Sequence, residues 1–148
     1  MATTKDHSLI LRKGIVAHLR ANAGLVALVP ASSIYGEQPK AIPAWPFIRC
    51  GFMRVIPIRL DCYLGGEYPF TLHAFSKANG TDEILTIRAA IIAAMDGASI
   101  DLANALNTGS AAVCLSRHDL SNLIPDGDEA GAYHDIHNFT VRVMEKTS

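Results

Sequence analysis

Histidine is the residue type here with the widest chemical reach, because its ring can ligate a metal or exchange a proton near neutral pH. His134 and His137 form an HxxH pair. The segment alternates like a strand, and residues three apart on a strand point to opposite faces. His73 and His118 also lie in or beside strand-like segments and could approach each other. Without cysteine or carboxylate partners at ligand spacing, solvated or sheet-surface histidines are the favoured interpretation. A small metal-dependent enzyme is kept as an alternative.

Other catalytic and ligand-binding patterns are missing from the sequence. There is no GxSxG nucleophile motif, no GxxxxGK[ST] loop, and no GxGxxG after a strand. The acidic stretch 126–129 lacks the spacing of a calcium-binding EF-hand loop, so it is interpreted as a solvated hairpin turn. The sequence therefore predicts a protein that is not an enzyme and that needs no cofactor or metal.

Contacts with other chains are the remaining role for the conspicuous side chains. Arginines cluster around the first predicted strand, where they could form ion pairs at an edge or contact a neighbouring subunit. Trp45, within proline-rich sequence, is either a lid on the core or an exposed anchor, and Tyr63 has the same two interpretations. Together with two aspartates of the acidic turn, the predicted interface residues are Trp45, Arg54, Arg59, Tyr63, Asp126 and Asp128.

The best-defined local structure is a strand, a tight turn and a helix within residues 68–97. Apolar and polar residues alternate over 70–74, as a strand with one buried face requires. Thr81 is placed as the N-cap of the helix, and Gly97 as its C′ glycine. Apolar residues recur at helical spacing between them, namely Ile84, Ile87, Ile91 and Met95.

The remaining elements can be placed around this unit. A helix begins near residue 6 or 8, and a short second helix could occupy 25–29 before Pro30. The prediction adds a short extended piece at 34–36, strands at 47–53, 111–119 and 133–145, and connections at 30–46, 56–67 and 120–131. The order helix, strand, strand, helix, strand, strand predicts an α+β fold, a four-stranded, mainly antiparallel sheet packed against two helices.

Composition limits the possible partners. A chain of 148 residues predicts one domain, 1–148. Net charge is −1 without a basic block, so no dedicated DNA-binding surface is indicated. Charged residues make up only 18%, which favours burying some surface against other chains. No apolar run approaches a membrane span, we expect no signal peptide, and three cysteines without CxxC spacing favour reduced thiols and assembly in a cytoplasm.

The pattern as a whole resembles the tail-completion or tail-terminator (head–tail joining) proteins of long-tailed double-stranded-DNA bacteriophages, prophages and gene transfer agents. The resemblance lies in LILRKGIVAHLRANAGLVALV, IYGEQPKAIPAWPFIRCG, YPFTLHAFSKANGTDEILTIRAAIIAAMDG and the closing HNFTVRVMEK. Order and spacing match over most of the chain, whereas residues 98–130 match only in layout.

The resemblance implies a structural virion protein at the head-proximal end of the tail. Such proteins form a ring, usually a hexamer, that terminates the tail tube and docks the head connector. The implied partners are further copies of the chain, tail tube protein, connector protein, and double-stranded DNA that passes through the lumen without sequence-specific contact. Another connector component, a stopper or an adaptor, is the nearest alternative.

Overall fold

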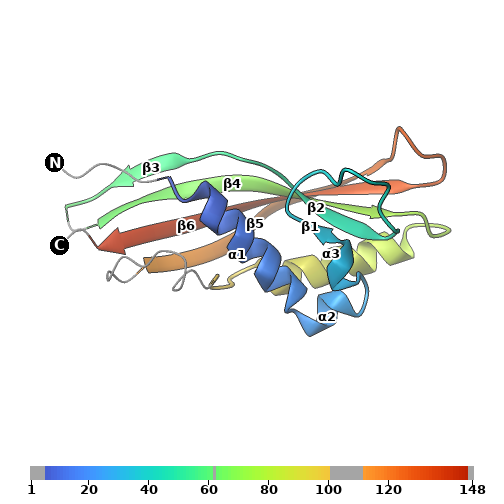
Figure 1. Cartoon of the computed structure of the whole chain (residues 1–148), viewed down its shortest axis with the longest axis horizontal. Coiled ribbons are helices and arrows are strands. Elements are labelled where there is room, and N and C mark those ends of the chain that lie inside the picture. The colour runs from blue at the N-terminus through green and yellow to red at the C-terminus, as the bar shows by residue number, and fades with distance from the viewer. Residues whose placement is uncertain (1–5, 62, 101–111, 147–148) are drawn as a thin grey trace.

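A computed structural model of the protein describes residues 6–61, 63–100 and 112–146. Its helices are α1 (Ser8–Arg20), α2 (Ala23–Val26) and α3 (Asp82–Met95), with the short 3-10 turn η1 (Ala31–Ser33). Its strands are β1 (Ile34–Tyr35), β2 (Phe47–Met53), β3 (Ile56–Arg59), β4 (Tyr63–Ser76), β5 (Ala112–Pro125) and β6 (Tyr133–Lys146). Long strands form an extended sheet, and the helices lie along one side of it (Figure 1). No helix in the described ranges has the length and apolar character to cross a membrane.

The six described strands form one mixed, mostly antiparallel sheet. Its order is β1-β2-β4-β6-β5, and β3 also pairs with β4. The centre is the ladder of β4 and β6, which runs from Tyr63 opposite Lys146 to Ser76 opposite Tyr133. β2 and β3 pair antiparallel with successive parts of β4, so together they form one side of the sheet. Only β1 pairs in parallel, with β2.

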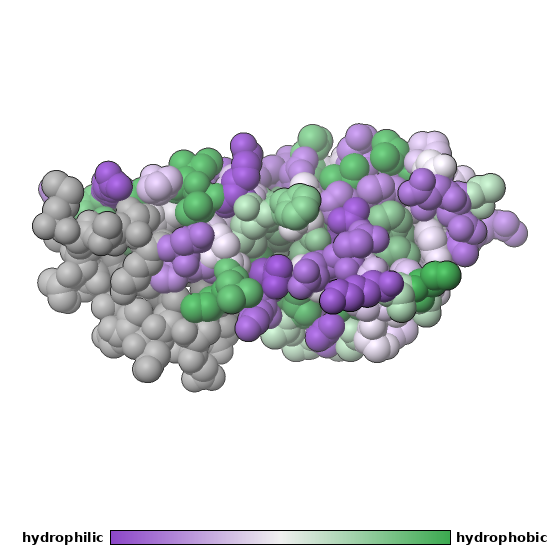
Figure 2. Space-filling model, turned by 45° about the horizontal axis from the view of Figure 1, so that its top comes forward, coloured by the Kyte–Doolittle hydropathy of each residue, from purple (hydrophilic) through white to green (hydrophobic). Residues whose placement is uncertain are grey.

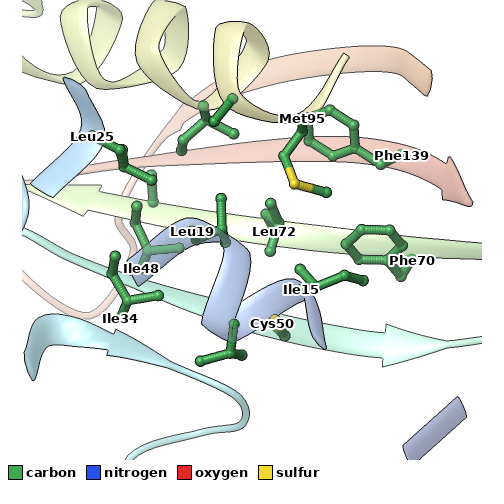
Figure 3. Close-up of a cluster of buried hydrophobic side chains, with 14 of the residues drawn as sticks. Ile15, Leu19, Leu25, Ile34, Ile48, Cys50, Phe70, Leu72, Met95 and Phe139 are labelled. Carbon is green, nitrogen blue, oxygen red and sulfur yellow. The ribbon is translucent and has the colours of Figure 1, made fainter. Parts of the chain in front are cut away.

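The hydrophobic core fills the space between one sheet face and the helices (Figure 3). α3 buries the four apolar residues that the periodicity predicts, Ile84, Ile87, Ile91 and Met95. α1 adds Leu11, Ile15 and Leu19. From the sheet come alternate residues of the central strands, Leu72, Ala74, Phe139, Val141 and Val143. The predicted α+β arrangement of helices on one sheet face is confirmed.

The predicted counts of four strands and two helices are wrong, because the described residues form six strands in one sheet and three helices. The extended piece at 34–36 is the short strand β1, and the segment expected to be a loop at 56–67 contains β3 and the start of β4. Pro57 is compatible with β3 because an edge strand need not donate on its outer side. Gly65 lies in β4 against β6, where an added Cβ would meet the Val143 carbonyl oxygen at 2.1 Å. A close backbone approach, and not loop flexibility, explains this glycine.

The strand predicted at 111–119 continues to Pro125, so the first half of the loop predicted at 120–131 is strand. A register shift between His118 and Leu120 interrupts the alternation on which the prediction depended. At α3, Gly97 adopts the expected positive φ of 70°. Thr81 precedes the helix without a side-chain capping hydrogen bond. Cys50 is a buried free thiol. Cys62 lies outside the described residues.

Candidate assembly surface

Trp45 lies on the sheet face opposite the helices and covers aromatic side chains there. Its ring meets Phe47 and Phe75 edge-on, at centroid distances of 5.1 and 6.0 Å. The Lys77 ammonium lies 4.7 Å from the Trp45 ring centroid and 3.2 Å from Glu129 Oε1. Trp45 is half-buried against these rings, and its role as an interface anchor stays a prediction. Through Lys77, it is linked to the turn between β5 and β6.

The two predicted interface arginines lie together at one edge of the sheet. Arg54 is exposed between β2 and β3, where its backbone N–H donates to the Pro69 carbonyl at 2.9 Å. Arg59 is the exposed last residue of β3. Tyr63 begins β4, next to β3, and its backbone is paired with Lys146. These three positions are therefore neighbours along one strand connection.

The two predicted interface aspartates lie at the opposite edge. Asp126 and Asp128 occupy the turn that joins edge strand β5 to β6. The Asp128 backbone N–H donates to Asp126 Oδ1 at 3.3 Å, and the Asp126 N–H donates to the Ala132 carbonyl at 2.9 Å. Such an aspartate-closed turn keeps the Asp128 carboxylate exposed. The predicted interface is thus divided between the two sides of the sheet.

The sheet face opposite the helices carries a polar network. Arg142 donates to Glu67 at 2.7 Å, Arg117 to Asp119 at 3.0 Å, and Thr140 Oγ1 to the other Asp119 oxygen at 2.6 Å. A shallow hollow on this face is lined by residues from several strands, among them Phe52, Arg54, Thr71, Asp119, Asn138 and Thr140. On the side that Figure 2 shows, hydrophobic residues are scattered among hydrophilic ones.

A buried polar chain under α3 was not predicted. Asp135 is fully buried and accepts two hydrogen bonds from Arg88 of α3. Asp135 Oδ2 lies 3.1 Å from His137 Nε2, although the two are not aligned as a good hydrogen bond. His137 Nδ1 then contacts the Ser121 hydroxyl at 2.8 Å. The alternation of the strand could have predicted this burial, because Asp135 and His137 lie on the same strand face as Phe139.

The histidines separate as the strand spacing predicts. His137 faces α3, while His134 lies on the other face, 2.7 Å from His73 Nδ1 and stacked on Phe75. Burial, Arg49 and the neighbouring histidines lower the pKa of His73 to about 4. His118 is not near His73 but contacts Ser121 at 2.8 Å. Within the described residues, no three potential ligand side chains gather around a common point.

The fold and the distribution of charged side chains define a class, a two-layer α+β domain with its predicted contact residues along two sheet edges. Comparison with protein families makes the identification more specific. The family model described as tail completion protein gp17 matches residues 13–143. Because that match spans most of the sequence, the chain belongs to the tail completion protein gp17 family. The resemblance seen in the sequence is thereby confirmed.

The fold also occurs among solved structures, and one example covers almost the whole chain. It is a chain from the virion of a native gene transfer agent particle, with a TM-score of 0.78. Sequence identity is 20%, and the superposition covers 95% of this chain and 99% of the other. The likeness therefore extends over essentially the whole of both chains. No curated protein sequence matches this one.

Proposed function

We propose that this protein is a non-enzymatic assembly component, which forms a closed ring, most simply a hexamer, at the head-proximal end of a tail. The ring ends growth of the tail tube and offers its other side to the head connector. The observation that carries the proposal is the family match over residues 13–143. The gene transfer agent likeness supports the same setting.

The distribution of charge in the fold is compatible with a ring. In a closed ring each subunit uses two different patches, one for each neighbour. Arg54 and Arg59 lie on one side of the sheet, and Asp126 and Asp128 on the other. Two patches that differ in charge and position are thus available for the two neighbours.

The partners follow from the position in the virion. One axial side of the ring contacts tail tube protein, and the other contacts the connector. Double-stranded DNA passes through the lumen without sequence-specific contact. The net charge of −1 agrees with that, because a DNA-binding lumen would carry an excess of basic residues.

The direct test polymerises tail tube protein with and without this chain. Tube lengths and tube ends are recorded by electron microscopy, and binding to tube and connector proteins is measured by pull-down. We expect shorter tubes with a ring at one end, and capture of both proteins. Unchanged tube lengths with bare ends would contradict the proposal. Binding to the connector alone would instead identify a stopper or an adaptor.

A further inference from the structure

The strands β1, β3 and β5 form the outer edges of the sheet, and they differ in how those edges are protected. The Ile34 carbonyl of β1 accepts two hydrogen bonds from the Arg20 guanidinium. β3 carries Pro57, which has no N–H to offer a further strand. In β5, residues 120–124 (Leu-Ser-Asn-Leu-Ile) contain neither a proline nor a charged residue. An edge without such protection can accept a further strand.

The pairing pattern of β5 identifies the backbone groups that a further strand would bind. Hydrogen-bonded and non-bonded pairs alternate along an antiparallel ladder. The N–H of His118, opposite Phe139, points away from β6 and donates to the Asp96 carboxylate at 2.9 Å. Ser121 and Leu123 lie opposite the residues two and four positions before Phe139, so they belong to the same class of pair. Among the described residues, no backbone group pairs with Ser121 or Leu123 on that outer side.

Apolar side chains border this edge on both faces of the sheet. Leu120 and Ile124 point away from the helices and are 56% and 37% exposed. Leu123 points to the other face, where it is half-buried beside α3. Arg88 of α3 binds the β6 residue opposite Leu123, and Leu85, one turn before Arg88, is exposed. The side chains of an added strand would therefore find apolar contacts on either face.

The surroundings of the edge are acidic. Residues 117–129, which contain the edge and the following turn, hold four acidic residues and one arginine. Residues 82–96, which contain α3, hold three acidic residues and one arginine, and that arginine already binds the buried Asp135. Within the described part of the chain, Asp126 and Asp128 of the turn form no ion pair, although the net charge of the whole chain is only −1. This concentration of negative charge favours a basic partner.

We propose that residues 120–124 of β5 bind an extended, basic segment of a neighbouring virion protein as one further strand of the sheet. The segment is basic because an acidic one would meet like charge on both bordering elements. Backbone hydrogen bonds to Ser121 and Leu123 provide affinity, and the apolar side chains beside them select alternate residues of the segment. The inference rests on the proposed function for the source of the segment.

Peptide binding tests the charge of the partner. Overlapping synthetic peptides that cover the tail tube protein and the head connector protein are the probes, and fluorescence anisotropy measures their binding to the full chain. We expect basic peptides to bind, and Asp126→Asn with Asp128→Asn to weaken them about threefold or more. Glu37→Gln with Asp61→Asn, the same loss of charge on exposed residues elsewhere, should bind as wild type. Binding of acidic peptides alone, or of none, would overturn the proposal.

A proline substitution tests strand addition. Leu123→Pro removes an N–H that points away from β6, so the ladder with β6 is retained. Leu123→Ala removes the same apolar side chain but keeps the N–H, which makes it the matched control. We expect the proline variant to bind a basic peptide about five- to tenfold more weakly than the alanine variant. Thermal melting verifies that both variants fold, and equal binding by the two folded variants would exclude strand addition.

Amide hydrogen exchange measured by NMR provides a test that needs no substitution. When a basic peptide binds, exchange should slow at Ser121 and Leu123. It should change less at Leu120, Asn122 and Ile124, whose N–H groups point toward β6 by the same alternation. Exchange that is unchanged at Ser121 and Leu123 would overturn the proposal. Exchange that slows there as the chain oligomerises without peptide would assign the edge to a second copy, and would overturn it equally.

The tube-length assay separates this inference from the proposed function. Wild-type protein that caps tubes but binds no basic peptide would contradict only the strand addition. Wild-type protein that binds basic peptides through Ser121 and Leu123, but neither forms rings nor caps tubes, would contradict only the function.

Discussion

Arg88 of α3 holds the carboxylate of Asp135 on β6 through two hydrogen bonds, Nε to Oδ2 at 2.8 Å and Nη2 to Oδ1 at 2.7 Å. Asp135 is fully buried, while the Arg88 side chain is 27% exposed. The pair fixes the helix to the centre of the sheet. From Asp135 the polar contacts continue through His137 and Ser121 to His118 on β5. One chain of side chains thus joins α3 to the edge strand β5.

Replacing Arg88 with Met should destabilise the fold strongly. The substitution leaves the Asp135 carboxylate buried without its cation, and breaking a buried ion pair in this way costs about 3–5 kcal/mol. Because Arg88 is partly exposed, we expect the free energy of unfolding in urea to fall by about 3 kcal/mol. Adding Asp135→Asn should recover part of it. A loss below about 0.5 kcal/mol, the range of ordinary surface substitutions, would mean that the pair is not formed.

The same carboxylate should control acid unfolding. Burial alone would raise the pKa of Asp135. The two hydrogen bonds from Arg88, together with the closeness of His137, outweigh burial and bring the pKa to about 2, below the ordinary 3.8. A lowered folded-state pKa stabilises the fold above the unfolded value and loses that contribution as pH falls through the folded value. Stability should therefore fall between about pH 4 and pH 2. Within that window, the free energy of unfolding of Asp135→Asn, measured in urea, should change less with pH than that of wild type. An equal dependence on pH would contradict the assignment.

His73 should affect the stability of the fold at a higher pH than Asp135 does. Burial, then Arg49, His134 and His137, lower its pKa from 6.5 to about 4. The unfolded chain binds the proton first, so stability should fall as pH decreases from about 6.5 to about 4. His134 shifts in the same direction, again chiefly through burial.

Thermal melting across that pH window measures the effect. His73→Gln removes the titrating ring and retains a polar group for Thr71, so its melting temperature should change less with pH than that of wild type. Arg49→Met should also reduce the change, because it removes a cation near His73. If the melting temperatures of both variants depend on pH as that of wild type does, the His73–His134 pair does not cause the loss of stability in this pH window.

The elements predicted correctly are those whose sequence pattern depends on one buried face. In α3 the spacing of Ile84, Ile87 and Ile91 determines both the helix and its orientation. In β6 the alternation of Phe139, Val141 and Val143 determines the inner face. Both patterns follow from contact with a single core, which is local information repeated along the chain.

The elements missed depend on partners distant in sequence. β3 exists because residues 64–67 of β4 pair with it, and its own exposed residues show no clear alternation. The end of β5 is defined by its ladder with β6, across the register shift near His118. Asp135 looks like a surface residue until Arg88, 47 positions away, is placed opposite it. The predicted interface residues could be chosen from the sequence by type, but only the fold shows that they lie on two sides of the sheet.

The packing of α3 on the sheet gives the last prediction. Ile91 is completely buried in the core, so Ile91→Ala should cost about 2–5 kcal/mol through lost burial and the cavity that remains. Leu85 on the same helix is 41% exposed, and Leu85→Ala should cost less than about 1 kcal/mol. Chemical denaturation of the two variants compares the same kind of truncation on two faces of one helix. Similar losses for both would mean that α3 does not pack on the sheet in this orientation. Because Arg88 lies between these positions, such a result would also remove the basis for the Arg88–Asp135 pair.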